Sequence, residues 1–154
     1  MSQLPENDLL FTLYDVARLM RVRADQRANL TGITRAQWVV LVWLERRPGI
    51  TQQELASLVE VEPITIARLV DRLEARQCVE RRLDPNDRRV RRLHLLPDAK
   101  PLLKEIHAYR RALERMVTAG LPKQDVACVL NALNAMKTNL LDEKRDYADS
   151  SDPS

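Results

Sequence analysis

The sequence predicts a mainly α-helical fold that carries one small β-hairpin. First, apolar residues make up 45% of the 154-residue chain, whereas aromatic residues make up 4% and Gly occurs only 3 times. This composition favours helices packed through aliphatic side chains over a β-sandwich or a barrel. Second, apolar residues recur at spacings of three and four along most of the chain, as they do on one face of a helix. Third, residues 79–96 depart from that spacing and read as two short strands joined by a polar turn.

Two helices are expected before residue 50. The first covers about residues 6–29 and carries its apolar positions on one face. That stripe consists of Leu10, Leu13, Ala17, Met20 and Ala24. Thr34 then caps a second helix that continues to about Arg47. Pro48 and Gly49 follow directly, and this pair ends the second helix sharply.

A short helix, a turn and another helix are predicted between residues 51 and 76. Thr51 and Glu54 have the spacing of a capping box, in which each side chain accepts a hydrogen bond from the other residue's backbone N–H. Pro63 suits the first position of the next helix, because its missing N–H would have no partner there. The apolar stripe of that helix is Ile66, Leu69, Val70 and Leu73. Two short helices in this order form a helix-turn-helix.

The predicted hairpin follows at once and is rich in arginine. Its strands cover residues 79–84 and 90–96, and Pro85, Asn86 and Asp87 supply the turn between them. The hairpin contains six arginines, which are Arg81, Arg82, Arg88, Arg89, Arg91 and Arg92. The net charge of the chain is only +3, but 20 of its 25 cationic residues are arginine. A run of this kind is usually a solvated surface; directly after a helix-turn-helix it is suited to contacts with phosphate or guanine.

Two more amphipathic helices are expected at the end of the chain, over residues 98–119 and 123–145. Gly120 and Pro122 separate them. Together with the first helix, these helices carry more apolar surface than the small middle region can cover. We therefore expect a second copy of the chain to complete the core, which makes the protein a homodimer. The alternative is a bundle of these helices within one chain.

These elements define the expected domain organisation. Residues 34–96 form a winged helix-turn-helix, in which the β-hairpin is the wing. Residues 6–30 and 98–145 form a helical dimerisation region. Residues 146–154 are polar and are expected to be a disordered tail.

Several classes of protein are disfavoured by the sequence. Residues 1–10 are acidic and lack the apolar stretch of a secretory signal, and no run approaches the roughly 18 apolar residues of a membrane span. Cys78 and Cys128 lie in different segments without metal-ligand spacing, so we expect no metal, no cofactor and reduced thiols in a cytoplasm. His94 and His107 are the only histidines, and neither has a nucleophile or metal ligand at a useful spacing. This argues against an enzyme.

A helix-turn-helix with a basic hairpin is suited to reading double-stranded DNA. The second helix of such a unit fits the major groove, where base edges differ in donors, acceptors and the thymine methyl group. Donors at the start of the first helix can contact a phosphate, and an arginine at the hairpin tip can enter a narrow minor groove. The predicted contact residues are Thr51, Gln52, Gln53, Pro63, Ile64, Thr65, Arg68, Arg72, Arg88 and Arg89. The alternative is that Ile64 only packs and Arg68 is only solvated.

The run VEPITIARLVDRLEARQCVERRLDPNDRRVRRLHL, residues 61–95, resembles the multiple-antibiotic-resistance regulator (MarR) family, including its SlyA-like branch. The order of elements fits this family from about residue 8 to residue 145. The resemblance implies a dimeric winged-helix transcription regulator that binds a pseudopalindromic operator.

The resemblance also implies roles for single residues. Arg89 matches the wing arginine of the family's D-x-R motif, and Asp71 matches the aspartate that braces this arginine. Arg68 matches the recognition-helix arginine of SlyA-like members. Asp87, beside the tip, is a further candidate to hold one of the tip arginines in position.

Many relatives release DNA when a small aromatic acid or phenol binds between the DNA-binding lobe and the dimer helices. By resemblance, Arg21, Trp38 and Arg68 are candidates to line such a pocket. Alternatively, Trp38 is an ordinary core residue. A peroxide-sensing cysteine, which one branch of the family has in its first helix, is missing from that helix here. The alternatives for Cys78 are a redox-active thiol and a small buried hydrophobic residue; because no partner cysteine lies nearby in the sequence, we expect the second.

The sequence departs from the family pattern at two places. Gln77 stands where the family often has Gly, so the preceding helix must end without the residue that adopts a left-handed conformation most easily. Leu96 and Pro97 replace the usual Leu-Thr pair, which leaves Asp98 to cap the next helix.

The expected outcome of DNA binding is repression by blocking polymerase, from two half-sites about one helical turn apart. Activation by displacing a silencing protein is one alternative. A winged helix that binds another protein is a second alternative, and the arginine-rich tip argues against it because the surface offered is cationic rather than apolar.

Overall fold

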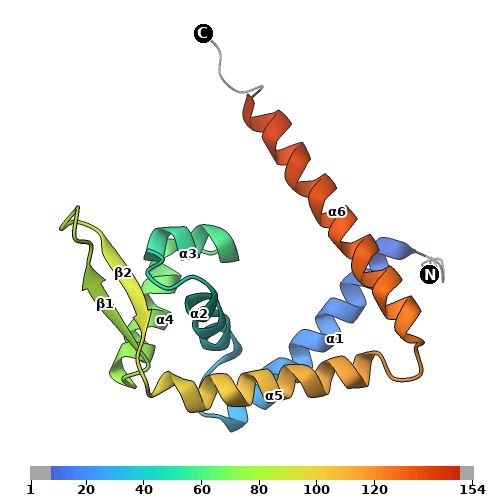
Figure 1. Ribbon diagram of the computed structural model, residues 1–154, viewed down its shortest axis with the longest axis horizontal. Helices are drawn as coiled ribbons and strands as arrows, with labels where there is room; N and C mark the ends of the chain where they lie inside the picture. The colour runs from blue at the N-terminus through green and yellow to red at the C-terminus, as the bar shows by residue number, and fades with distance from the viewer. Residues whose placement is uncertain (1–7, 150–154) are drawn as a thin grey trace, which may run out of the picture. The chain divides into compact units, whose positions relative to one another are not determined.

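The computed structural model describes residues 8–149, with side chains described as far as Asp142. Figure 1 shows helices and a two-stranded sheet that follow one another in the predicted order. The elements are α1 (Leu9–Leu30), α2 (Arg35–Arg46), α3 (Gln52–Val59), α4 (Pro63–Ala75), β1 (Val79–Leu83), β2 (Arg91–Leu95), α5 (Ala99–Val117) and α6 (Lys123–Asp149). The predicted fold class is confirmed: the chain is mainly α-helical and contains a winged helix-turn-helix, α3–α4 followed by the β1–β2 wing.

The chain divides into two compact units at residue 114, within α5. The first unit contains α1 to α4, the wing and most of α5, and the second contains the end of α5 and α6. The sequence grouped residues 6–30 with the C-terminal helices, of which residues 6 and 7 lie outside the described residues. In the structure, α1 contacts α2, and Ala28 near the end of α1 is fully buried in the core of the first unit. This part of α1 therefore belongs with the winged helix.

The hydrophobic core of the first unit lies between α2, α3, α4, the wing and the start of α5. Its largest fully buried side chains are Leu41, Leu44, Leu55, Ile66, Leu73, Leu93, Ile106, Val40, Val70 and Val79. Each such side chain contributes about 1.5–3 kcal/mol through its removal from water. Because α4 and both wing strands contribute to one core, α4 and the wing are fixed to a common base.

The predicted helix starts are mostly confirmed. The Thr34 hydroxyl accepts the N–H of Gln37 at the start of α2, and Pro63 is the first residue of α4. The start of α5 differs from the expectation. Asp98 precedes α5 without a side-chain capping bond among the described residues; instead, the N–H groups of Ala99 and Lys100 bond to the carbonyls of Leu96 and Pro97. Tight local turns therefore replace the expected side-chain cap.

The two wing strands pair antiparallel, from Val79 opposite Leu95 to Leu83 opposite Arg91. A third segment, the connection between α2 and α3, lies along the other edge of β2. The Gly49 N–H donates to the Leu93 carbonyl at 3.0 Å, and the Leu93 N–H donates to the Ile50 carbonyl at 2.9 Å. The base of the wing is thus held on both sides, although no residue pattern in the sequence predicted this third segment.

The departure at Gln77 has a clear structural consequence. Gln77 adopts the left-handed conformation, with φ of 55°, that glycine would adopt more easily. The Cys78 N–H then donates to the Leu73 carbonyl at 3.0 Å, which closes the end of α4 in a Schellman-type turn. The turn directs the chain from α4 into β1.

The last helix is longer than predicted. Helix α6 continues to Asp149, four residues beyond the expected end at 145, because residues 123–149 contain no Pro or Gly. Of the predicted disordered tail, residues 150–154 lie outside the described residues. Within residues 8–149, no helix combines the length and the apolar character that a membrane crossing requires.

Candidate nucleic-acid interface

The N-terminus of α3 is built by the predicted capping box. The Thr51 hydroxyl accepts the N–H of Glu54 at 3.1 Å, and the Glu54 carboxylate accepts the N–H of Thr51 at 2.8 Å. This backbone hydrogen bond lowers the pKa of Glu54. Gln53 is exposed beside the cap, whereas Gln52 is half-buried. The capping box therefore fixes the start of α3, where the Gln53 amide is exposed and the Gln52 amide is half-buried.

The first turns of α4 expose the residues that the sequence singled out. Pro63, Ile64, Thr65 and Arg68 are all exposed, and Ile64 retains 60% of its accessible surface. The opposite face of the helix is buried. Packing in the core of the first unit therefore does not account for Ile64. Arg72 lies one turn after Arg68 and is also exposed.

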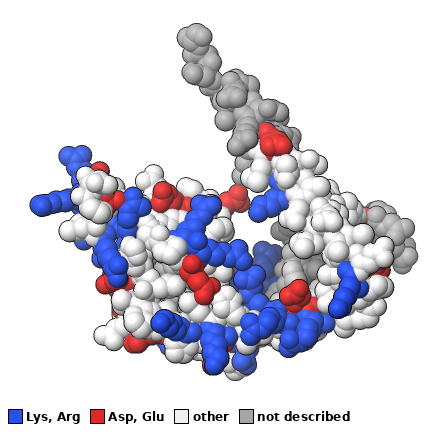
Figure 2. All heavy atoms as spheres, viewed as in Figure 1, with Lys and Arg blue, Asp and Glu red and all other residues white. Residues whose placement is uncertain are grey.

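The tip of the wing presents two free arginines. Arg88 and Arg89 are exposed, and neither side chain forms a hydrogen bond or ion pair with the described side chains of residues 8–142. Asp87 acts on this tip through the backbone: its carboxylate accepts the N–H of Arg89 at 2.9 Å and leaves both tip guanidinium groups free. Figure 2 shows cationic side chains gathered at this free end of the β1–β2 hairpin.

Asp71 braces the wing through Arg81 rather than through Arg89. The Asp71 carboxylate accepts from the Arg81 guanidinium at 2.6 Å. The same guanidinium also pairs with Glu74 of α4 and donates to the Gln52 side-chain carbonyl at 2.6 Å. The expected pairing of Asp71 with Arg89 is therefore not observed. Strand β1 places Arg81 beside α4, whereas Arg89 lies in the turn at the far end of the hairpin.

Sequence reasoning did not identify the role of Arg81, although a signal was present. Alternation along β1 places Arg81 on the same face as Val79, which is fully buried. An arginine on the inward face of a strand requires carboxylate or carbonyl partners. Asp71 and Glu74, one turn apart on the preceding helix, supply them. Arg81 thus joins α3, α4 and β1 in one place.

The remaining wing arginines divide into paired and free side chains. Arg82 pairs with Glu80 on the same strand, and Arg92 pairs with Asp84 at the start of the turn. Arg91 is exposed, with no ion pair in the described part of the chain. From the sequence, the wing arginines outside the tip were expected to serve the phosphate backbone or to cover the sheet; in the structure Arg82 and Arg92 bind carboxylates of the wing itself.

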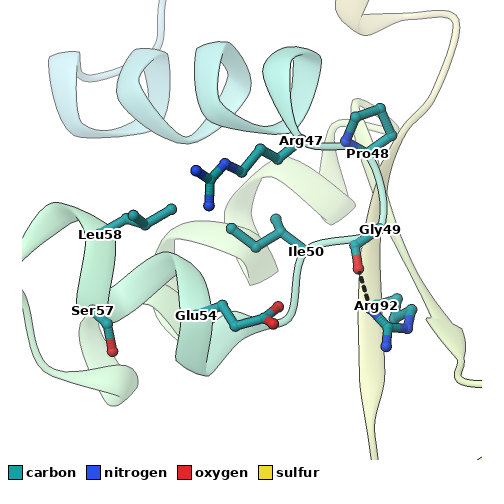
Figure 3. A pocket seen from close by; sticks show the side chains of 8 residues that line it. All are labelled: Arg47, Pro48, Gly49, Ile50, Glu54, Ser57, Leu58 and Arg92. Atoms are coloured by element: carbon teal, nitrogen blue, oxygen red, sulfur yellow. Dashed lines mark hydrogen bonds between the residues drawn. The ribbon is translucent and has the colours of Figure 1, made fainter.

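A pocket of about 480 Å³ opens beside the wing, where the α2–α3 connection meets α3 and β2. It is lined by Arg47, Pro48, Gly49, Ile50, Glu54, Ser57, Leu58 and Arg92. In Figure 3, the Arg47 side chain extends over Ile50 toward Leu58, and a dashed line joins Arg92 to the Gly49 carbonyl. The lining includes none of the residues proposed by resemblance for an effector pocket.

Comparison with known proteins gives a consistent result. The MarR family model matches residues 33–90. The HTH-type transcriptional regulator YsmB of Bacillus subtilis is 30% identical over 120 residues, which is 78% of this chain and 82% of that protein. The chain belongs to the MarR family. This confirms the resemblance found in residues 61–95. The protein is therefore a transcription regulator. It belongs to a family of transcription regulators, which are not enzymes.

Solved structures show the same MarR-type fold. The structure of the transcriptional regulator PA3341 is 33% identical, with a TM-score of 0.78, and the match covers 88% of this chain and 99% of that one. The crystal structure of MarR has a TM-score of 0.82 at 23% identity and covers 95% of this chain and 99% of that one. Because both matches extend well beyond residues 33–90, they include the terminal helices as well as the winged helix.

The effector pocket implied by the MarR resemblance does not assemble in this structure as expected. Trp38 is only 5% exposed and lies in the core, where its ring nitrogen donates to the Thr31 hydroxyl at 3.3 Å. Its ring also packs against Tyr109, with 5.6 Å between ring centres. Arg21 and Arg68 are exposed on α1 and α4, and within the described residues no hydrogen bond or ion pair joins either to Trp38. The alternative for Trp38, an ordinary core residue, is the one observed.

The two cysteines differ in environment. Cys78 is buried, as expected, and burial raises the pKa of its thiol, which disfavours the reactive thiolate. Cys128 is exposed on α6. Among the described side chains of residues 8–142 there is no group of three or more His, Cys, Asp or Glu that could hold a metal ion.

Proposed function

We propose that this MarR-family regulator binds double-stranded DNA in a sequence-specific manner, as a homodimer on a pseudopalindromic operator, and acts as a repressor. The observation that carries the proposal is the joint exposure of two surfaces. The first turns of α4 expose Ile64, Thr65 and Arg68, and the wing tip exposes Arg88 and Arg89 with no partner among the side chains of residues 8–142. Both surfaces belong to elements that share one hydrophobic core.

The exposed turns of α4 have the chemistry of a recognition helix. Arg68 can donate two hydrogen bonds to the edge of a guanine, and Ile64 and Pro63 can contact thymine methyl groups. Arg72, one turn further, can reach a phosphate or a base edge beside Arg68. Thr65 can donate its hydroxyl proton to a phosphate or accept from a base.

The remaining contacts position this helix. The free N–H groups and the Gln53 amide at the start of α3 can bind one phosphate. Gln52 has its carbonyl oxygen engaged by Arg81, so its amide nitrogen is the atom that can donate to DNA. Arg88 and Arg89 can insert into a minor groove beside the helix, most strongly where A·T-rich sequence narrows that groove.

The homodimer is supported by unpaired apolar side chains on the terminal helices. On α1, Leu10 and Tyr14 are each more than two thirds exposed. On α6, Leu130 and Leu140 are each more than half exposed. A soluble monomer rarely leaves so many large apolar side chains in water. We infer that a second copy of the chain covers them, because a dimer with two-fold symmetry matches the two half-sites of a pseudopalindromic operator.

Release of the operator by a small aromatic acid or phenol, as the family resemblance implies, belongs to the same proposal. A site that uses Trp38 together with Arg21 and Arg68 requires the Trp38 ring to become accessible. Benzoate and salicylate are suitable probes, and the readout is the dissociation of a preformed DNA complex.

The experiment that tests DNA binding starts from a random-sequence duplex library enriched by the protein. The affinity of the enriched duplex is then measured from about 50 to 200 mM salt. We expect the logarithm of the binding constant to fall linearly with the logarithm of salt concentration, with tighter binding to the enriched duplex than to a scrambled one. A library that shows no enrichment contradicts the proposal and favours a winged helix that binds another protein.

A further inference from the structure

Asp84, at the start of the wing turn, is almost completely buried in an otherwise exposed hairpin end. Only 6% of its surface is accessible. One carboxylate oxygen accepts the N–H of Asn86 at 2.7 Å and the N–H of Asp87 at 3.1 Å, and the other accepts from the Arg92 guanidinium. The hydrogen bond from Arg92 and those backbone bonds hold the pKa of Asp84 below its ordinary value. The carboxylate therefore stays ionised at neutral pH, and its four-residue turn is closed around it.

Arg92 connects this turn to a different part of the first unit. Besides binding Asp84, its guanidinium donates to the Gly49 carbonyl at 2.8 Å, as the dashed line in Figure 3 shows. Thr51, the cap of α3, forms a β-bridge with Arg92 through the backbone. The wing turn is thus tied, through one side chain, to the connection between α2 and α3.

A two-stranded ribbon is only marginally stable by itself and bends easily. Beyond the last pair, Leu83 and Arg91, two further backbone hydrogen bonds close the turn, from the Asp84 N–H to the Val90 carbonyl and from the Val90 N–H to the Asp87 carbonyl, each at 3.0 Å. The link from Gly49 through Arg92 to Asp84 is a side-chain contact that joins this turn to the α2–α3 connection. Asp87, whose N–H is held by Asp84, in turn accepts the N–H of Arg89. A chain of hydrogen bonds therefore leads from the α2–α3 connection to the tip arginine.

We propose that Asp84 and Arg92 are positioning residues that hold the wing tip so that Arg88 and Arg89 reach the DNA backbone and minor groove. This inference rests on the proposed function. In this view Arg92 does not contact DNA: its charge is used inside the protein, and the buried carboxylate of Asp84 promotes DNA binding although it is an anion.

Substitution of Asp84 separates this inference from simple electrostatics by the direction of the effect. Removing a negative charge close to DNA should strengthen binding if the charge acts only through repulsion. Loss of the positioning contact should weaken it. We expect Asp84→Asn to lower affinity for the enriched duplex about tenfold, a loss on the scale of one or two wing contacts. The matched control is Glu80→Gln, which removes a wing carboxylate outside this link and should leave the affinity unchanged or slightly raised.

Substitution of Arg92 tests the other partner without changing net charge. Lysine keeps the positive charge but lacks the fork that binds a carboxylate and a carbonyl together. We expect Arg92→Lys to lower affinity about as much as Asp84→Asn, and the neighbouring Arg91→Lys to change it by less than about twofold, since a lysine serves nearly as well at an exposed, unpaired position.

A combined variant provides the readout that a direct DNA contact would not give. In an Arg88→Ala/Arg89→Ala background the tip has nothing left to position, so adding Asp84→Asn should cause no further loss of affinity. A residue that contacts DNA itself should instead add its full effect in this background.

Thermal unfolding of each variant shows whether the fold persists at the assay temperature. If Asp84→Asn does not fold, Arg92→Lys and the combined variant carry the test. The inference is overturned if folded Asp84→Asn binds as tightly as the unaltered protein, or if its effect persists without the tip arginines. Failure of the unaltered protein to bind any duplex contradicts the proposed function instead.

Discussion

At the scale of single residues, the structure divides the arginines of α4 and the wing into free and bound side chains. Arg68, Arg88 and Arg89 have no partners among the described side chains, which end at Asp142, whereas Arg81 and Arg92 have their guanidinium groups bound to carboxylates and carbonyls. A free guanidinium keeps its donors for a ligand, and a bound one does not. The division predicts which arginines read DNA and which support those that do.

Arg68→Ala should weaken base discrimination at one fixed operator position. If Arg68 makes a bidentate contact with a guanine, the substitution should reduce the free energy of binding by about 1–3 kcal/mol on the duplex that carries this guanine. On a duplex in which that base pair is changed, the reduction should be smaller. Binding to a set of duplexes that vary one base pair at a time measures this. Arg46→Ala, an exposed arginine at the end of α2, is the control. A uniform loss across all duplexes would show a phosphate contact instead.

Arg89→Ala should lower affinity most on operators with A·T-rich flanks. A narrow minor groove concentrates negative potential, so an inserted arginine gains more there than beside G·C pairs. We expect a loss of about 1–2 kcal/mol on an A·T-rich flank, within the range for one arginine contact, and a smaller loss on a G·C-rich flank. The affinities of the unaltered protein and of Arg89→Ala are measured on two duplexes that differ only in their flanks. Equal losses of affinity on both duplexes would count against minor-groove insertion.

At the scale of elements, local patterns in the sequence predicted the helices and the hairpin, and contacts between elements set their limits. The Thr51–Glu54 box and Pro63 at the start of α4 are encoded within a few residues, so both were predicted correctly. The partner of Asp71 depends on the register of β1 against α4, ten residues away, and was predicted wrongly. The strand-like segment at Gly49 depends on a partner more than 40 residues away and was missed.

The end of α4 offers a test of backbone strain. The left-handed conformation of Gln77 costs about 1–2 kcal/mol in the folded state, and a glycine at this position would not have this cost. Glycine also has more conformational freedom in the unfolded chain, which offsets part of that gain in stability. We expect Gln77→Gly to raise the free energy of unfolding by about 0.5–1 kcal/mol. Urea denaturation measures the change. Gln77→Ala, which keeps a Cβ in the same conformation, should give no such gain; equal stabilisation by both would point to a cause other than φ.

The wing turn should make stability depend on pH in acid. The pKa of Asp84 is lower in the folded chain than its ordinary value, so its contribution is present at neutral pH. That contribution disappears as pH falls from about 4, the ordinary aspartate value, through the lower folded value. The difference in unfolding free energy between the unaltered protein and Asp84→Asn should therefore shrink as pH falls from about 6 to 3. A difference that stays constant over this range would mean that the asparagine acts through packing alone.

At the scale of the whole molecule, charge and apolar surface are distributed unequally along the chain. The unpaired arginines proposed to contact DNA, Arg68, Arg88 and Arg89, lie on α4 and the wing, in the first unit. Residues 114–142 have no fully buried side chain within the single chain and leave several large aliphatic side chains exposed. These are Met116, Val117, Leu121, Val129, Leu130, Leu133, Leu140 and Leu141. A long helix with this surface needs a partner to be stable, because most helical stability in proteins comes from packing.

The homodimer can be tested with a charge on that surface. Leu130 and Leu133 lie three residues apart on α6 and are both exposed. Because burying two aspartates in an apolar interface is costly, Leu130→Asp/Leu133→Asp should shift sedimentation from dimer to monomer. Two tethered half-sites bind together 10²–10⁴ times more tightly than one, so operator affinity should fall by about 100-fold or more. Asn131→Asp, a charge on an exposed polar position of the same helix, should change neither property. A monomer that still binds the full operator tightly would show that one chain reads the whole site, and a variant that remains dimeric would place the interface elsewhere.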